Sequence, residues 1–566
     1  MNRKLLLPLA ALALSLGSTA CEKDPETEPV EFTRDELQWD STDRNGTNAQ
    51  LFLNNIYTYL PDGFNRVDGE FLESGTDDAV PSRLNRAVEY FTRGALTPTN
   101  NPDARWATPY AAVRRVNILL ANLDRVPVTA ATNTLWKAEA RFARALNYFE
   151  LLKRYGGVPL LGDRVLGLNE NLALPRNTYA ECVSYIVSEC DAIKNNLRPE
   201  AGLADTDWGR ITRGCAVALK GRTLLYAASP LYNGGRLGGA TDLQGYPNYD
   251  QSRWQLALDA NLELNTLTSN YYSLVTTGVP TAYTSVFTTK RNREIILGNQ
   301  SSNNTSLENA LGPIGYATFA VSSQGLTSPT QNFVNAFPTL TGLPIGATGS
   351  GYDPQNPYAN RDPRLAASVF TNGTPWLGRP VETFDGGRDR PGGAATQTRT
   401  GYYLRKFLGN FATNTVYANT SHNYPIFRYA ETLLNIAEAY NELGQPEQAV
   451  TRLVLLRSRA GLTAGANGRY GIPVGISQGQ LRELIRTERR IELSFEEHRF
   501  WDVRRWKTAE TELNGPLFGV RIANATPLVF TYPQLSTMVF PARLYYLPLP
   551  NDEILENPSL VQNPGW

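Results

Sequence analysis

Apolar side chains recur at helical spacing along the stretch from Phe427 to Gly461. Successive apolar positions lie three or four residues apart, which puts them on one face of an α-helix with about 3.6 residues per turn. Gly444 interrupts the pattern, as expected for a glycine just past a helix C-terminus. The stretch therefore predicts two helices joined by a tight turn. Their apolar positions are Tyr429, Leu433, Ile436, Tyr440 and Leu443, then Ala449, Leu453, Leu456 and Ala460.

The small and aromatic residues of this hairpin have the spacing of a tetratricopeptide repeat. Ala437, Gly444 and Ala449 let two helices approach closely, and Tyr440 fills the groove between them. An ordinary helical hairpin is the alternative interpretation. One hairpin of either kind cannot bury its apolar face alone, so we expect further helix pairs in the chain.

Six segments of the first half supply three such pairs. Leu135–Leu152 has the most regular apolar spacing, and Thr178 with Glu181 forms a capping box that begins the next helix. We therefore predict a mainly α fold, with four helix pairs in residues 46–267 and 425–506 as a scaffold. The six segments are 49–59, 106–120, 135–152, 178–197, 213–228 and 254–267.

Residues 268–424 have little helical periodicity and are rich in Gly, Pro, Asn, Ser and Thr. An unstructured insert of this length is improbable inside a compact domain unless it serves a function. We therefore expect short strands and loops there, and we place ligand binding on this insert and on nearby loops of the first half. Residues 507–566 are interrupted by prolines and are predicted to form an extended tail that packs on the body.

The N-terminus is predicted to be a targeting segment. Leu5–Leu16 is an apolar run of 12 residues, which is shorter than the roughly 20 needed to span a bilayer. Small residues precede Cys21, and residues 18–21 resemble a bacterial lipobox, although Ser18 stands where that pattern has Leu. We expect residues 1–20 to be removed, Cys21 to be acylated, and 21–45 to form an acidic tether. An ordinary cleaved signal peptide is the alternative.

Composition excludes several classes of function. The 566-residue chain has zero formal net charge and no run of more than two basic residues, which argues against nucleic-acid binding. Its two histidines, His422 and His498, have no metal-ligand spacing, so neither a metal site nor a cofactor is expected. Cys182, Cys190 and Cys215 are predicted to be buried thiols without disulfides.

Charges alternate densely along residues 488–506, where Trp501 and Trp506 accompany them. One interpretation is a carboxylate pair for acid–base chemistry. We favour the other, a network of ion pairs and Arg–Trp stacking that fixes the last helix to the repeats. Interleaved opposite charges leave no carboxylate to acquire a raised pKa.

Aromatic and polar side chains of the insert are the candidate ligand contacts, because sugars offer apolar C–H faces and a rim of hydroxyl groups. Trp376 is the one tryptophan in the insert and the first candidate for a stacking platform. For each aromatic the alternative is packing inside its own loop. For Asp77 and Asp78, and for Glu73 shortly before them, the two interpretations are contact with a ligand and capping of a turn. The other candidates are Tyr283, Tyr316, Tyr352, Tyr358, Phe384, Asp385 and Arg388.

Several ordered motifs together resemble the SusD/RagB family of outer-membrane nutrient-binding lipoproteins. They include residues 428–444, the run 487–506, the tail 546–566, the segment 362–365 and the helix 138–161. The family usually has Glu-Gly where this chain has Glu496 and Glu497. The resemblance covers nearly all of the chain after Cys21, which would form a single domain over residues 46–566.

The resemblance implies a right-handed superhelical scaffold of four tetratricopeptide-like helix pairs. It implies capture of a glycan at the cell surface, lipid anchoring in the outer membrane, no catalysis, and a SusC/RagA-like TonB-dependent transporter as partner. Three alternatives remain open: an oligopeptide as cargo, a glycoside hydrolase using paired carboxylates, and a scaffold that holds another protein.

Overall fold

The computed structural model describes residues 34–566, apart from 168, 319–320 and 393–396. The predicted leader, Cys21 and most of the tether therefore lie outside the described residues. Within the described part, no helix combines the length and the apolar character required to cross a bilayer.

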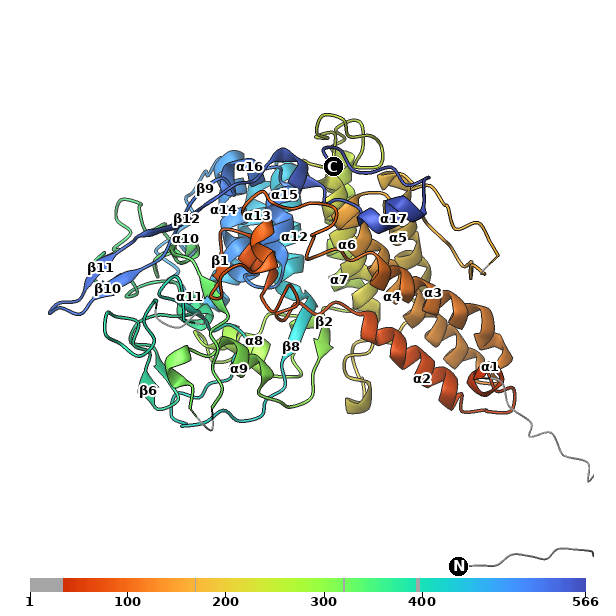
Figure 1. The fold of residues 1–566 in the computed structure, drawn as a ribbon, viewed down its shortest axis with the longest axis horizontal. Coiled ribbons are helices and arrows are strands. Elements are labelled where there is room, and N and C mark those ends of the chain that lie inside the picture. The colour runs from red at the N-terminus through yellow and green to blue at the C-terminus, as the bar shows by residue number, and fades with distance from the viewer. Residues whose placement is uncertain (1–33, 168, 319–320, 393–396) are drawn as a thin grey trace, which may run out of the picture.

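Helices carry most of the regular structure, and they stack side by side across the molecule (Figure 1). The helices are α1 (Arg34–Gln38), α2 (Thr47–Ile56), α3 (Ala107–Asn122), α4 (Ala130–Tyr155), α5 (Tyr179–Ile193), α6 (Arg213–Ala228), α7 (Ser252–Leu267), α8 (Ala282–Thr288), α9 (Ser306–Leu311), α10 (Gln331–Ala336), α11 (Pro363–Ser368), α12 (Tyr429–Glu442), α13 (Pro446–Ala460), α14 (Gln478–Glu492), α15 (His498–Arg505), α16 (Ala509–Glu512) and α17 (Asn551–Glu556).

The strands are short and pair antiparallel in two-stranded sheets: β1 with β3, β2 with β8, β4 with β7, β5 with β6, β9 with β12 and β10 with β11. Their bounds are β1 (Ala79–Pro81), β2 (Ile295–Gln300), β3 (Thr327–Pro329), β4 (Val369–Phe370), β5 (Pro375–Trp376), β6 (Arg379–Pro380), β7 (Tyr403–Leu404), β8 (Asn423–Arg428), β9 (Gly515–Phe518), β10 (Arg521–Ala523), β11 (Val529–Thr531) and β12 (Gln534–Met538).

The predicted mainly α scaffold is confirmed. Helices α2 to α7 pack as neighbours in chain order, and α12 continues the stack on α7 although the insert separates the two in sequence. Gly221 of α6 lets α7 approach closely, since a Cβ there would lie 2.7 Å from Asn261 Oδ1. Asn261 in turn accepts a hydrogen bond from Asn435 of α12 at 3.1 Å. A glycine thus brings the two helices of the third pair together, and the amide of Asn261 joins that pair to the fourth.

The insert packs around an aromatic core to which Phe71 and, from the last helices, Ile491 and Phe495 also contribute. The insert itself lies next to the helical scaffold (Figure 1). It is connected to the scaffold by β8, which pairs with β2 and runs directly into α12. The three cysteines are buried and free, as predicted.

Two terminal regions are more structured than predicted. Before residue 46, within the expected tether, α1 forms and Trp39 is buried against the first helices. In the tail, β10 pairs with β11 and, outside them, β9 pairs with β12, so the four strands form one hairpin that the prolines and glycines of the sequence did not indicate. The rest of the tail packs on the body, where Asn563 donates to the carbonyls of Tyr155 and Leu547 at 3.0 and 2.7 Å.

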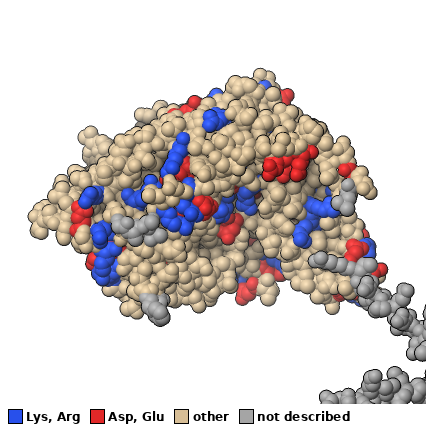
Figure 2. Space-filling view, in the orientation of Figure 1, with Lys and Arg blue, Asp and Glu red and all other residues tan. Residues whose placement is uncertain are grey.

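The charged run 488–506 forms a buried ion network, as favoured. Arg428 at the end of β8 pairs with Glu492 of α14 at 2.7 Å, with Glu496 at 2.6 Å and with Glu294 at 2.9 Å. Burial alone would raise the pKa of Glu492, but Arg459, Arg428 and Arg364 hold it well below its usual range. Charged side chains of both signs mix on the face that Figure 2 shows, without a continuous positive field.

Candidate functional site

The prediction that Trp376 is a stacking platform is wrong, because its ring is completely buried. It lies in the insert core between Phe370 and Phe411, whose ring centroids are 4.9 and 5.3 Å away. The loop that carries it folds inward, so the alternative interpretation, packing within the insert, applies.

Tyr283 and Tyr316 are also buried. The hydroxyl of Tyr283 donates to the Glu492 carbonyl at 2.9 Å. Tyr316 lies against the guanidinium group of Arg379, 3.4 Å from the ring centroid, and donates to the Arg379 carbonyl. Neither ring is available to a ligand in this structure.

Asp77 and Asp78 hold the loop before β1 to the last helices instead of facing solvent. Asp77 pairs with Arg499 and Arg490, both at 2.9 Å, and Asp78 pairs with Arg490 at 2.6 Å. Burial would raise the pKa of Asp77, but the two arginines lower it. Both aspartates are therefore structural, and Glu73 beside them is fully buried as well.

Four predicted residues do gather at the β10–β11 hairpin. Tyr358 lies edge-on to Phe530 of β11, with ring centroids 5.9 Å apart, and the hydroxyl of Tyr352 lies near that of Tyr532, whose pKa burial raises, with a further contribution from Tyr352. Phe384 bridges Ile522 of β10, and Asp385 pairs with Arg521 at 3.1 Å. Tyr532, which the sequence analysis missed, is the most exposed of these rings at 38 %. We name Tyr352, Tyr358, Phe530 and Tyr532 the hairpin shelf.

Arg388 is exposed and forms a two-point ion pair with Glu382, at 2.9 and 2.8 Å. Arg379 and Asp389 form a second pair close to it in sequence, at 2.7 Å. The polar groups of this glycine-rich loop thus satisfy one another, which leaves Arg388 without a demonstrated role in binding.

A pocket lined entirely by the insert lies beside α9. It encloses about 460 Å³ and is lined by hydroxyl groups, an amide and a few apolar side chains, with one aromatic ring. We name it the insert pocket. Its residues are Thr305, Asn309, Ala317, Thr318, Val321, Ser322, Ser323 and Tyr417.

Tyr417 is the aromatic wall of the insert pocket. Its hydroxyl lies 2.8 Å from Ser323 Oγ, and its half-buried ring is backed by Phe411 and Trp376 at centroid distances of 5.7 and 6.1 Å. Gly312 leaves room for it, since a Cβ there would lie 2.0 Å from the tyrosine hydroxyl. Burial raises the pKa of Tyr417, so the group stays a neutral donor and acceptor.

The lining of the insert pocket contains no charged side chain among the described residues. Such a surface suits a neutral ligand that has both apolar faces and hydroxyl groups. The sequence analysis missed Tyr417, although it placed ligand binding in this insert. The available signal was one aromatic residue among the asparagines and threonines of residues 413–420.

Two family models match the chain. One, described as the SusD family, matches residues 292–566, and the other, described as starch-binding and associating with the outer membrane, matches residues 36–206. A SusD-like protein from Formosa agariphila is 26% identical over 86% of this chain and 85% of its own length.

Solved structures agree along almost the whole chain. A SusD-like protein from Bacteroides fragilis has a TM-score of 0.77 and 28% identity, covering 94% of this chain and 99% of its own. A SusD-like protein described as laminarin-binding has a TM-score of 0.60 and 22% identity, covering 92% of this chain and 99% of its own. At that identity the likeness concerns the fold.

Proposed function

The chain belongs to the SusD/RagB family, and from this premise we propose that it binds a nutrient glycan at the surface of the outer membrane. The geometry of the insert pocket supports this proposal. One half-exposed ring, Tyr417, stands among neutral hydroxyl and amide groups, which is the arrangement that a sugar ring with its hydroxyl rim requires.

The proposal assigns Tyr417 the stacking role that the sequence analysis gave to Trp376. Trp376 then acts behind the pocket by supporting the tyrosine ring. Ser323 orients the tyrosine hydroxyl, and Asn309 lies on the same lining to accept and donate hydrogen bonds to sugar hydroxyls. The hairpin shelf is the competing surface for the same role.

Calorimetric titration of the full chain with a panel of neutral oligosaccharides tests the site. We expect Tyr417→Ala to weaken binding by about tenfold or more, because stacking of a sugar face on the ring and one hydrogen bond are each worth on the order of 1 kcal/mol. Tyr532→Ala on the hairpin shelf is the matched control and should leave the dissociation constant unchanged. Weaker binding in Tyr532→Ala and unchanged binding in Tyr417→Ala would instead place the site on the hairpin shelf.

Two further measurements ask whether Trp376 only supports the ring of Tyr417 and whether the cargo is a glycan. Trp376→Phe keeps a ring behind Tyr417 and should preserve most of the binding. A lack of binding to every glycan of the panel, together with saturable binding of an oligopeptide, would replace the glycan by peptide cargo.

We further propose that Cys21 carries the lipid anchor and that the protein passes its glycan to a SusC/RagA-like TonB-dependent transporter. Labelled palmitate should enter the wild-type protein and not Cys21→Ser. Isolation of the native protein from outer membranes, followed by mass spectrometry, should identify a TonB-dependent transporter bound to it. Recovery of the protein alone from gently solubilised membranes would contradict the transporter proposal.

The proposed role is binding without catalysis. Three acidic residues of the insert are held in ion pairs: Asp385 with Arg521, Glu382 with Arg388, and Asp389 with Arg379. Incubation with a labelled oligosaccharide that binds should release no shorter product. Hydrolysis that persists in the purified protein would favour the glycoside hydrolase instead.

A further inference from the structure

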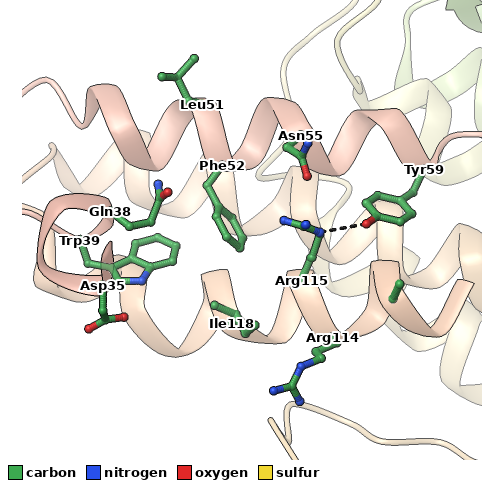
Figure 3. Close-up of a pocket in the computed structure, with 11 residues that line it drawn as sticks. Asp35, Gln38, Trp39, Leu51, Phe52, Asn55, Tyr59, Arg114, Arg115 and Ile118 are labelled. Atoms are coloured by element: carbon green, nitrogen blue, oxygen red, sulfur yellow. Dashed lines mark hydrogen bonds between the residues drawn. The ribbon is translucent and has the colours of Figure 1, made fainter. Parts of the chain in front are cut away.

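A second cavity runs as a groove between α2 and α3, at the end of the molecule that α1 to α3 form and away from α9 and the insert pocket (Figures 1 and 3). It encloses about 740 Å³ and is open to solvent. Helix α1 and the turn after it close one end. We name it the N-terminal groove. Nothing in the proposed function uses it.

Aromatic rings form one end of the N-terminal groove. Phe52 points from α2 toward α3, and its ring centroid lies 5.1 Å from that of Trp39 (Figure 3). Trp39 is buried and therefore fixed in place, whereas Phe52 is only half-buried. Part of a rigid apolar surface thus remains uncovered in the described structure.

A single arginine points into the N-terminal groove from the opposite wall. Arg115 of α3 lies between Phe52 and Tyr59, with its guanidinium carbon 5.9 Å from each ring centroid. Its Nε donates to the Tyr59 hydroxyl at 2.9 Å (Figure 3). That hydrogen bond orients the guanidinium plane and leaves its terminal nitrogens for a ligand. No ion pair of Arg115 is found among the described residues.

The charges around Arg115 leave it unbalanced. Asp35 is the one carboxylate in the described lining of the N-terminal groove, and Arg125 engages it at 2.8 Å. Arg114 contributes a second cation to the rim, although it turns toward the Leu166 carbonyl, to which it donates at 2.6 Å. The other polar groups of the lining include the amides of Gln38 and Asn55 and the hydroxyl of Tyr59, which are all neutral. The groove is therefore complementary to an anion.

We propose that the N-terminal groove binds a carboxylated saccharide, an oligosaccharide that contains a uronic acid. Its carboxylate pairs with Arg115, whose fork geometry accepts two oxygens. A sugar C–H face packs on Phe52, and hydroxyl groups reach the amide of Asn55. An acidic peptide is less well matched, because Arg115 is the single cation that points into a groove otherwise lined by rings and amides.

Calorimetric titration with tetragalacturonate, using the full chain with Cys21→Ser, tests this proposal. The fully methyl-esterified tetramer is the matched ligand, since it keeps the sugar rings and removes the charge. We expect saturable binding of the acid, with the ester at least about tenfold weaker, because a charge-assisted hydrogen bond contributes about 1.5–3 kcal/mol. Equal binding of acid and ester, or no binding of the acid at millimolar concentration, would overturn the proposal.

Paired variants locate the site. Arg115→Gln should reduce the affinity for the acid to that of the ester, whereas Arg114→Gln, the same charge change one residue away, should reduce it less than about threefold. Tyr417→Ala should have no effect, so failure here is separable from failure of the insert pocket. An equal loss in both arginine variants would indicate unspecific attraction and contradict the proposal. The proposal would also be contradicted if a peptide of residues 22–33 bound in an Arg115-dependent way while tetragalacturonate did not bind.

Discussion

Glu73 is a buried carboxyl group without a cation to balance it. Its Oε1 accepts the backbone N–H of Glu497 at 2.6 Å, and its Oε2 has no partner among the described residues. Burial, assisted by the charge of Glu497, raises the pKa of Glu73 to about 8 from its ordinary value near 4.5. The folded protein therefore binds this proton more tightly than the unfolded chain does, and its stability falls as the pH rises from about 4.5 through about 8.

Glu73→Gln should remove this pH dependence, since glutamine resembles the protonated acid and keeps the acceptor for Glu497. We expect its free energy of unfolding to exceed that of the wild type by at least about 1 kcal/mol at pH 9, and to match it near pH 5. Urea unfolding at both pH values measures the difference. Glu447→Gln, at an exposed carboxylate beside Arg469, is the control and should gain nothing at pH 9. A variant that is less stable than the wild type at pH 9 would contradict the assignment.

Glycines at helix ends carry the tight turns of the repeat elements. Gly444 follows α12 with φ of +74°, and a Cβ there would meet no atom within 4 Å. Gly444→Ala should therefore cost about 1 kcal/mol through backbone strain alone. Gly479→Ala lies inside the first turn of α14, also in open space, and should instead stabilise by about 0.5–1 kcal/mol. Denaturant midpoints of the two variants should shift in opposite directions. Equal shifts would remove the conformational argument.

The repeat elements were predictable because their signals are local. The stripe from Tyr429 to Leu443 and the capping box at Thr178 each lie within a few turns of one helix. Exposure in the insert, and in the loop before β1, depends instead on residues far apart in sequence. Trp376 is covered partly by Phe411 and Tyr417, and Asp77 is buried by Arg499. Residue type alone therefore identified the region that carries the candidate site but not the ring that faces the pocket.

The helical scaffold and the insert are joined by a buried group of charges centred on Arg428. This arginine ends β8, where the insert passes into α12. Its partners are Glu294 beside β2, Glu492 at the end of α14, and Glu496 between α14 and α15. The lowered pKa of Glu492 means that the group stabilises the fold above the unfolded pKa near 4.5. That stabilisation is lost as the pH falls through the lower folded value.

Arg428→Met should destabilise the whole molecule, because it leaves three carboxylates buried without this cation. We expect a loss of about 3–5 kcal/mol in the free energy of unfolding at pH 7, the range found when one partner of a buried pair is removed. Arg86→Met, at the partly exposed pair with Asp68, is the control and should cost less than about 1 kcal/mol. The difference between Arg428→Met and the wild type should shrink at acid pH, as protonation relieves the unpaired carboxylates. If the unfolding curves from fluorescence of the insert and from helical circular dichroism coincided in the wild type but not in this variant, Arg428 would be the link that makes the insert and the helical scaffold unfold together. A loss below about 1 kcal/mol would instead show that packing alone joins them.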